Sequence, residues 1–101
     1  NESLIKDLLV ILDDFDQALP SLEKEQNKEG LLMIRKKLMK ILSEYGLQPI
    51  ECEGKKCDPN FHEVISKEKC QQESGTILED FSTGYLLKTK VIRPSKVKIA
   101  E

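Results

Sequence analysis

The chain has 101 residues, a net charge of −2 and three cysteines, and 34% of its side chains are charged. This length fits one domain, or one helical module joined to one small β module. The charge is too small to indicate a nucleic-acid or anionic-membrane ligand, and no apolar run approaches the roughly 20 residues that span a bilayer. An odd number of cysteines without framework spacing favours a reducing, cytoplasmic compartment.

Residues 1–19 are predicted to form an amphipathic helix that is already in helical phase at its start, which suggests that an N-terminal part is missing. Two adjacent apolar stripes repeat at spacings of three and four. A face this wide is typical of bundles of three or four helices. Pro20 ends the helix, because proline disfavours helical geometry in the preceding residue. The first stripe contains Leu4, Leu8, Ile11 and Phe15, and the second contains Ile5, Leu9, Leu12 and Leu19.

A second amphipathic helix is predicted from about Gly30 to Tyr45, after a polar connector at residues 21–29. Gly46 suits the left-handed position that follows many helices, and Leu47 would then pack back on the helix end. Two wide-faced helices cannot bury their apolar surface against each other alone. We therefore predict a homodimer in which two hairpins form a four-helix bundle. The stripe of the second helix contains Leu31, Ile34, Leu38 and Ile41.

Three acids, Asp13, Asp14 and Asp16, cluster near the end of the first helix. This is the unfavourable end of the helix dipole for a carboxylate. A metal site would need further ligands from elsewhere, so we interpret the cluster as a solvated helix face. It is expected to lie opposite the basic residues 35–37, in the same chain or across the dimer.

Residues 47–101 are predicted to be rich in β-structure. Asp58-Pro59-Asn60 is turn-like, because the Asp side chain can bond to the backbone two residues on. Strands are expected at residues 76–81, 85–93 and 96–99, with Ser82–Gly84 as a three-residue hairpin loop and Pro94 as a turn. The expected architecture is therefore α+β. A helical dimerisation region at 1–46 is followed by a small antiparallel β domain at 47–101.

The sequence gives only weak support for a catalytic, metal-binding or nucleic-acid-binding function. Spacing argues against a zinc site from Cys52, Cys57, Cys70 and His62, because it fits no compact knuckle. The single histidine, His62, is more often a structural hydrogen-bonding residue than a catalyst, so neither triad chemistry nor a thiol enzyme with Cys57 or Cys70 is favoured. Only Phe81 and Tyr85 could stack on bases beside the basic residues of the last strands, and the whole chain is acidic. The basic residues of these strands are Lys88, Lys90, Arg93, Lys96 and Lys98. A small dimeric nucleic-acid-binding or scaffold protein is the alternative function.

Four motifs resemble the GrpE family, the nucleotide exchange factors of DnaK-type heat-shock chaperones. They occur in the family's order and cover nearly the whole chain. The resemblance implies a homodimer with a long paired helix, a four-helix bundle and one β-wing per chain. Residues 1–19 would be the end of the long helix. The motifs are Glu44–Leu47, Asp58–Val64, Ser74–Ile77, and Phe81–Leu87 continuing to Val91–Val97.

The resemblance also implies a mechanism and its residues. One wing would press on the ATPase domain of the chaperone, tilt a lobe outward and lower its affinity for ADP. Gly46 and Leu47 would set the orientation of the wing, and neither a metal nor a cofactor is implied. The positions that match the family's wing contacts are Cys57, Pro59, Phe81, Lys90 and Ile99. The family more often has an aliphatic or aromatic residue where Cys57 stands.

Overall fold

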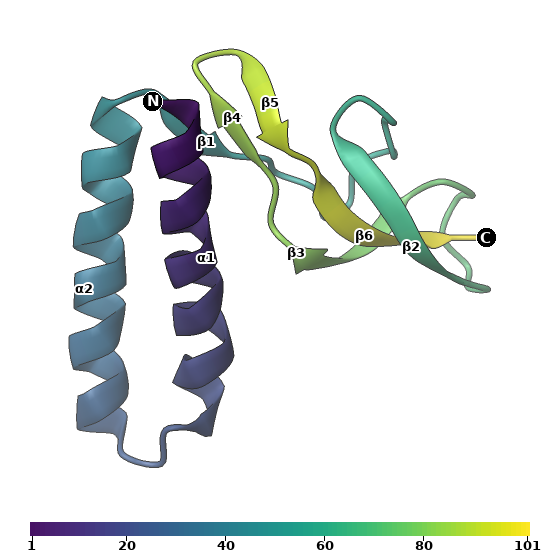
Figure 1. Ribbon diagram of the computed structural model, residues 1–101. Coiled ribbons are helices and arrows are strands. Elements are labelled where there is room, and N and C mark those ends of the chain that lie inside the picture. Colours follow the sequence, from purple (N-terminus) through teal and green to yellow (C-terminus); the bar gives the residue numbers. More distant parts are fainter. The chain divides into compact units, whose positions relative to one another are not determined.

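The computed structural model describes all 101 residues, which divide into two compact units, Asn1–Gly46 and Leu47–Glu101 (Figure 1). The first unit contains only helices, and the second contains every strand. The chain therefore has the predicted α+β composition. None of its helices is both long enough and apolar enough to cross a membrane.

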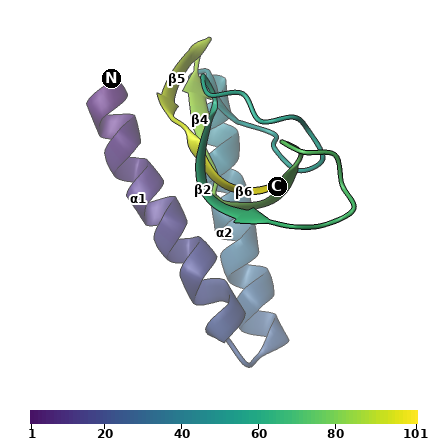
Figure 2. The ribbon, with the colours of Figure 1, turned by 90° about the vertical axis from the view of Figure 1, so that its right-hand side faces the viewer.

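The helical unit is a hairpin of two antiparallel helices joined through a 3-10 turn (Figure 1). The first helix begins where the Asn1 side chain accepts a hydrogen bond from a backbone N–H of the first turn, at 3.2 Å. It ends just before Pro20, as predicted. In the turned view of Figure 2, the two helices meet near the 3-10 turn and diverge from it. The elements are α1 (Glu2–Ala18), η1 (Leu19–Ser21) and α2 (Glu25–Glu44).

The second helix begins earlier than predicted, at Glu25 rather than at Gly30. The segment 25–29 is polar on all sides, so it carries no apolar periodicity that could reveal a helix. Its Glu, Gln and Lys residues are nevertheless strong helix formers. Glu25 lies in the first turn, where the helix dipole favours an acidic side chain. The predicted polar connector is therefore mostly helical.

One acid of the Asp13–Asp16 cluster pairs across the hairpin. The Arg35 guanidinium donates from Nε to Asp16 Oδ1 at 2.8 Å and from a terminal nitrogen to Asp16 Oδ2 at 3.4 Å. The contact between the acidic cluster and the basic residues of α2 therefore forms within one chain. An exposed pair of this kind contributes about 0–1 kcal/mol, so it helps to align the helices more than it stabilises them.

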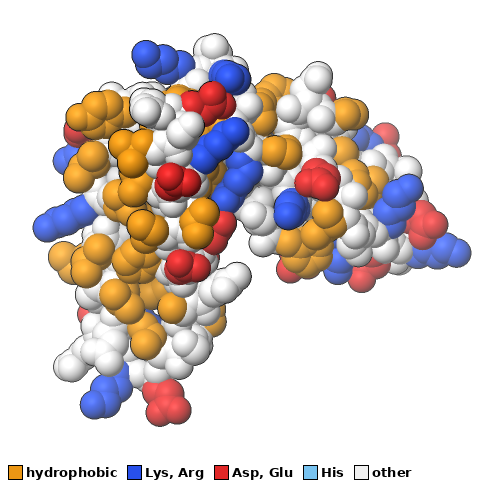
Figure 3. Space-filling view, viewed as in Figure 1, with side chains coloured by type: hydrophobic (Ala, Val, Ile, Leu, Met, Phe, Trp, Pro, Cys, Tyr) orange, Lys and Arg blue, Asp and Glu red, His pale blue; other side chains and the backbone are white.

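The apolar surface of the helical unit is divided between a buried and a partly open stripe. Ile5, Leu9 and Leu12 of α1 are buried. Figure 3 shows hydrophobic side chains gathered over the helices on the face in view. In the stripes that we predict to form the dimer interface, the half-buried members are Leu8, Phe15, Leu31 and Leu38. The exposed members are Leu4, Ile11, Ile34 and Ile41, whose exposed fractions are 57%, 46%, 54% and 52%.

The β unit contains two three-stranded sheets. The first sheet has the order β1-β4-β5 and is antiparallel throughout. The second has the order β2-β6-β3, in which β2 runs parallel to β6 and β3 runs antiparallel to it. The prediction of one antiparallel sheet was therefore wrong. The strands are β1 (Leu47–Pro49), β2 (His62–Glu68), β3 (Ile77–Ser82), β4 (Tyr85–Leu87), β5 (Lys90–Arg93) and β6 (Ser95–Ala100).

Two connections differ from the prediction. The expected strand at residues 85–93 is a hairpin, because the backbone reverses at Lys88, whose φ is 51°. Residues 82–84 are not a hairpin loop but carry the chain from the β2-β6-β3 sheet to the β1-β4-β5 sheet. Asp80 shapes this crossing by accepting bonds from the Ser82 N–H and the Thr83 hydroxyl, both at 3.1 Å. A Cβ on Gly84 would collide with the backbone of residues 93–95, so the crossing requires glycine.

The β unit has a core of its own to which both sheets contribute. Its buried members are Ile50, Cys52, Ile77 and Val97. Leu86 and Val91 pack on this cluster from the first sheet, whereas Ile77 and Val97 belong to the second. The sheets are therefore tied to each other by shared apolar burial, which makes the unit a stiff platform for surface residues. Further half-buried side chains on the cluster are Cys57, Phe61 and Ile99.

Candidate partner-binding surface

Phe81 is the most prominent apolar side chain among the predicted contacts. It lies on β3, with 46% of its surface exposed. The Lys98 ammonium is 5.8 Å from the centre of its ring. Lys98 is itself held by Glu79 at 3.6 Å and by Glu68 at 4.0 Å. A cation–π contact at such a site contributes about 0.5–1 kcal/mol, so the ring is oriented before any partner arrives.

The sequence suggested that Phe81 stands at a hairpin, but in the structure it does not. Because β3 pairs with β6 and β4 pairs with β1 and β5, the chain leaves the sheet after Ser82, the residue that follows Phe81 and ends β3. The register of β3 on β6 shifts between Asp80 and Ser82, which marks Phe81 as the irregular residue of the ladder. Irregularities of this kind redirect a side chain, and here the redirected side chain is the exposed ring.

Ile99 and Phe81 belong to the same β2-β6-β3 sheet. Ile99 lies opposite Ile77 in the register of β6 and β3, and it is half-buried against the core of the β unit. It therefore supports the sheet from the core and presents only part of its side chain. Lys90 is exposed at the start of β5, so it belongs to the other sheet. The five predicted contacts thus do not form one cluster on a single sheet.

Cys57 and Pro59 lie on either side of Asp58, in the segment that leads into β2. The Asp58 side chain accepts a bond from the Asn60 N–H at 2.9 Å, which confirms the turn predicted from the sequence. Pro59 is exposed on this turn. Cys57 is half-buried against the core, and its N–H donates to the Gly75 carbonyl at 2.8 Å. Of the two, only Pro59 offers a fully open surface.

Gly46 occupies the left-handed conformation predicted for it, with φ of 96°. Its N–H donates to the Ser43 carbonyl at 3.0 Å and closes the end of α2. Other residues would carry a steric penalty in this conformation. Leu47 follows as the first residue of β1 and is fully buried. At the junction of the two units, a glycine in a conformation that other residues adopt only at a steric cost is thus followed by a fully buried leucine.

None of the cysteines is hydrogen-bonded to the histidine. His62 is buried, and its Nδ1 accepts a bond from the Asp58 N–H at 2.9 Å. Burial raises the pKa of the Cys52 thiol above its usual range, so this group stays protonated at neutral pH. Cys70 is exposed, and no group of three or more His, Cys, Asp or Glu side chains is placed to hold a metal ion. The zinc set considered from the sequence is therefore not assembled.

Two features of this surface were missed by sequence reasoning. Lys98 was counted only among the basic residues of the last strands, yet it holds the Phe81 ring. The alternation of Lys96, Val97 and Lys98 was the available signal, because it places both lysines on the face opposite the buried Val97. The second feature, an open pocket beside His62, has no linear signal, because it combines residues from separate segments.

Comparison with known proteins covers the whole chain. Residues 1–101 match the family model described as GrpE. The chain is 45% identical over 101 residues to Protein GrpE of Thermoplasma volcanium, covering 100% of this chain and 54% of that protein. For Protein GrpE of Methanosphaera stadtmanae the identity is 40% over 102 residues, with 100% and 59% covered. For Protein GrpE of Oceanobacillus iheyensis it is 37% over 103 residues, with 98% and 54% covered. The chain thus spans about half the length of these curated relatives.

Proposed function

The chain belongs to the GrpE family, and from this premise we propose that it acts as an adenyl-nucleotide exchange factor. It is a co-chaperone that binds the ATPase domain of a DnaK-type chaperone and promotes the release of ADP. It performs no covalent chemistry of its own. Residues 1–46 form the dimerisation region, residues 47–101 form the wing that engages the chaperone, and the compartment is the cytoplasm.

The observation that carries this proposal is an exposed, pre-oriented aromatic ring on a stiff β unit. Phe81 is 46% exposed and is held by Lys98, while the sheets beneath it share one buried core. Aromatic side chains on rigid supports are the usual anchors of protein–protein interfaces, because little conformational entropy is lost when they bind. Pro59 and Ile99 add apolar surface, Lys90 adds a charge at the rim, and Cys57 supports the Asp58 turn.

The exchange mechanism follows from linkage. A partner that binds the open form of the ATPase domain more tightly than the closed form must shift the population towards open. Accelerating ADP release about a thousandfold requires roughly 4 kcal/mol of differential binding in the barrier for release. A few well-packed anchors supply energies of this size, each contributing about 2 kcal/mol or more. Stiffness matters because a compliant wing would deform instead of the lobe.

The helical unit is proposed to form a homodimer through a four-helix bundle. Leu4, Ile11, Ile34 and Ile41 leave about half of their surface open to water in the single chain, which supports this proposal. A second copy provides helices of matching length and polarity. Gly46 and Leu47 then connect the bundle to the wing.

The experiment that tests the proposed function is the rate of release of a fluorescent ADP analogue from a DnaK-type chaperone. The chaperone is loaded with the analogue and mixed with excess ATP, with and without this protein at micromolar concentration. We expect release to accelerate and the effect to saturate as the exchange factor is titrated. An unchanged release rate from a chaperone that hydrolyses ATP normally would refute the proposal.

A further inference from the structure

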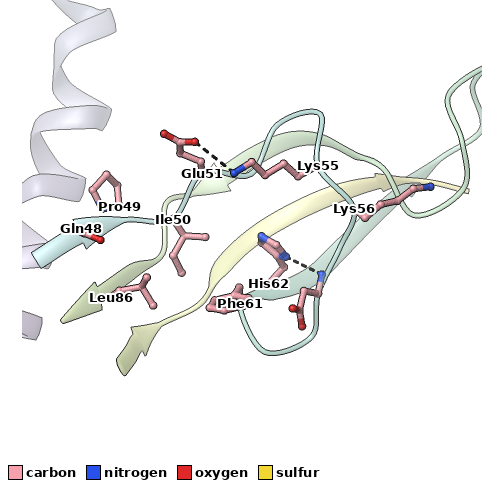
Figure 4. A pocket seen from close by; sticks show the side chains of 10 residues that line it. Gln48, Pro49, Ile50, Glu51, Lys55, Lys56, Phe61, His62 and Leu86 are labelled. Atoms are coloured by element: carbon pink, nitrogen blue, oxygen red, sulfur yellow. Dashed lines mark hydrogen bonds and ion pairs between the residues drawn. The ribbon is translucent and has the colours of Figure 1, made fainter. Parts of the chain in front are cut away.

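His62 is a buried histidine whose side chain closes the turn that precedes β2 (Figure 4). Its Nδ1 accepts a hydrogen bond from the Asp58 N–H at 2.9 Å, and its backbone N–H donates to the Asp58 carbonyl at 2.9 Å. The Phe61 N–H donates to the same carbonyl, and the Asn60 N–H donates to the Asp58 side chain, both at 2.9 Å. The imidazole thus reinforces a turn that three main-chain donors also hold.

The bond to Asp58 fixes the protonation state of the imidazole. A ring nitrogen that accepts a hydrogen bond carries no proton, so the proton of the neutral ring is on Nε2. Nε2 is buried and has no hydrogen-bond partner. A second proton would have to go to Nδ1, where the new N–H would point at the Asp58 N–H. The closed turn therefore cannot accommodate an imidazolium, because one of its donors would oppose another donor and the second would be buried without an acceptor.

The charged groups beside His62 already have partners within the protein. An open pocket of about 610 Å³ adjoins the histidine, and its titratable lining residues, apart from His62, are Glu51, Lys55, Lys56 and Asp58. The two lysines are ion-paired, one with Glu51 at 3.4 Å and the other with Glu73 at 3.1 Å. The Asp58 carboxylate accepts a main-chain bond of the turn. An acid on this side could meet an imidazolium only by leaving a bond that it already makes.

The sheet side of His62 also offers no acid. In the ladder of β2 and β6, His62 lies opposite Ser95, which is fully buried and uncharged. The next pair of the ladder consists of Glu63 and Lys96, which lie opposite each other. Glu63 is exposed, and the strand alternation turns its side chain away from the buried His62. A charge on the imidazole would therefore not be compensated from this side.

We propose that His62 is a pH-sensitive latch on the Asp58 turn. When the turn opens, the imidazole reaches water, and an exposed histidine takes up a proton at about pH 6.5. The closed turn accepts only the neutral ring. Protons thus bind the open form and not the closed form, so the latch is fully closed above this range and is progressively released as the pH falls below it.

The latch concerns the β unit alone and does not depend on what the protein binds. Its consequence for recognition rests on the proposed function. Cys57 and Pro59 flank Asp58, so an open turn would displace two of the five predicted contact positions. Phe81 and the helical unit make no bond to this turn. Acidification would thus weaken the wing contact and leave the dimer intact.

The test is hydrogen exchange of the Asp58 amide, followed by NMR in the intact protein. At each pH the measured rate is compared with the intrinsic rate of an unprotected amide, and the resulting protection factor is free of the direct effect of pH on exchange. His62→Asn is the matched variant, because asparagine places a carbonyl oxygen near the position of Nδ1 and does not titrate. The amide of Leu12 in α1 is the internal control.

From about pH 7.5 to about pH 5.5, we expect the protection factor of Asp58 to fall about tenfold in the wild type, because protonation at the ordinary histidine value favours the open turn by that factor. It should stay constant in His62→Asn, and at Leu12 in both proteins. Unchanged protection in the wild type, or an equal fall in both proteins, would overturn the inference.

If His62→Asn fails to fold, the imidazole ¹⁵N shifts of the wild type decide the outcome. In molecules whose turn is closed, Nδ1 should remain unprotonated at about pH 5.5, because its lone pair still accepts the Asp58 N–H. An imidazolium inside a closed turn would overturn the inference. None of these readouts involves a chaperone, so their failure is distinct from failure of the proposed function.

Discussion

The two units of the chain bury their apolar side chains to different degrees. Of the eleven large hydrophobic side chains that are exposed, eight lie in the helical unit and only Val64, Ile65 and Phe81 lie in the β unit. The β unit encloses a shared core between its sheets, and the helical unit has only a few buried positions, among them Ile5, Leu9 and Leu12. The two units are therefore stabilised differently. One is nearly complete as a single chain, and the other is expected to need a second copy.

This comparison also separates the proposed roles. A surface that is completed by a second copy is hidden in the assembly and cannot meet another partner. The few apolar side chains that stay exposed on a unit with its own core are the ones available for recognition. Phe81 is such a residue, so changes in the helical unit and changes at Phe81 should affect different measurements.

Leu38→Asp is expected to have the largest effect. Leu38 lies on the half-buried stripe of α2, and in the proposed bundle its replacement would bury an unpaired charge. We expect the free energy of unfolding of the helical unit to fall by about 4 kcal/mol, and the dimer to dissociate as the helices melt. Far-ultraviolet circular dichroism and size-exclusion chromatography measure both effects. Lys37→Asp, on the exposed face of α2, is the control and should stay dimeric. A Leu38→Asp monomer with intact helices would contradict the shared-core argument.

Ile77→Ala should affect the other unit. Ile77 is 1% exposed in the core of the β unit, so truncation leaves a cavity and should cost about 3 kcal/mol. The midpoint of denaturant unfolding of the β unit should fall while the protein remains dimeric. Ile65→Ala removes a similar side chain from a site that is 51% exposed, and should change stability by less than about 0.5 kcal/mol. Equal losses in the two variants would show that the core is misassigned.

Phe81→Ala should leave both units folded and weaken only recognition. We expect a loss of about 2 kcal/mol in binding to the chaperone's ATPase domain and slower ADP release, with unchanged thermal stability. Lys90→Gln, which changes a charge at the proposed rim, should have a smaller effect that disappears at high salt. If Phe81→Ala accelerates ADP release from the chaperone as strongly as the wild type does, Phe81 is not the anchor of the interface.

The smallest expected effect concerns Cys52 and pH. Burial raises the pKa of this thiol in the folded protein above its unfolded value, so the contribution of the protonated thiol to stability is complete below the unfolded pKa. That contribution is lost as the pH rises through the folded pKa. The unfolding free energy of the wild type should therefore fall relative to that of Cys52→Val as the pH rises into the alkaline range. Cys70→Ser, at an exposed site, should parallel the wild type. A constant difference at every pH would contradict the assigned cause.

Local chemistry made part of this fold predictable from the sequence. The apolar stripes, the helix end before Pro20, the positive φ of Gly46 and the side-chain bond of Asp58 all depend on residues within one or two turns of each other. The early start of α2 was missed because polar helix formers give no periodic signal. A prediction based on apolar patterns alone therefore shortens such helices.

Long-range pairing explains what the sequence could not provide. The parallel ladder of β2 and β6 joins strands that are separated by the whole of β3–β5, and nothing in either strand specifies its partner. The reversal at Lys88 occurs without glycine, so residues 85–93 resemble one continuous strand. The unpartnered His62 nitrogen arises only once β2 and the Asp58 turn are placed beside β1, so neither this nitrogen nor the pocket beside it could be predicted.

The most direct test of the difference between the units is thermal unfolding at several protein concentrations, with the mass followed by sedimentation equilibrium. We predict the mass of two chains at micromolar concentration, and a helical transition whose midpoint rises with concentration. The transition of the β unit should keep its midpoint. A single-chain mass with fully folded helices, or a helical midpoint that does not depend on concentration, would contradict the account.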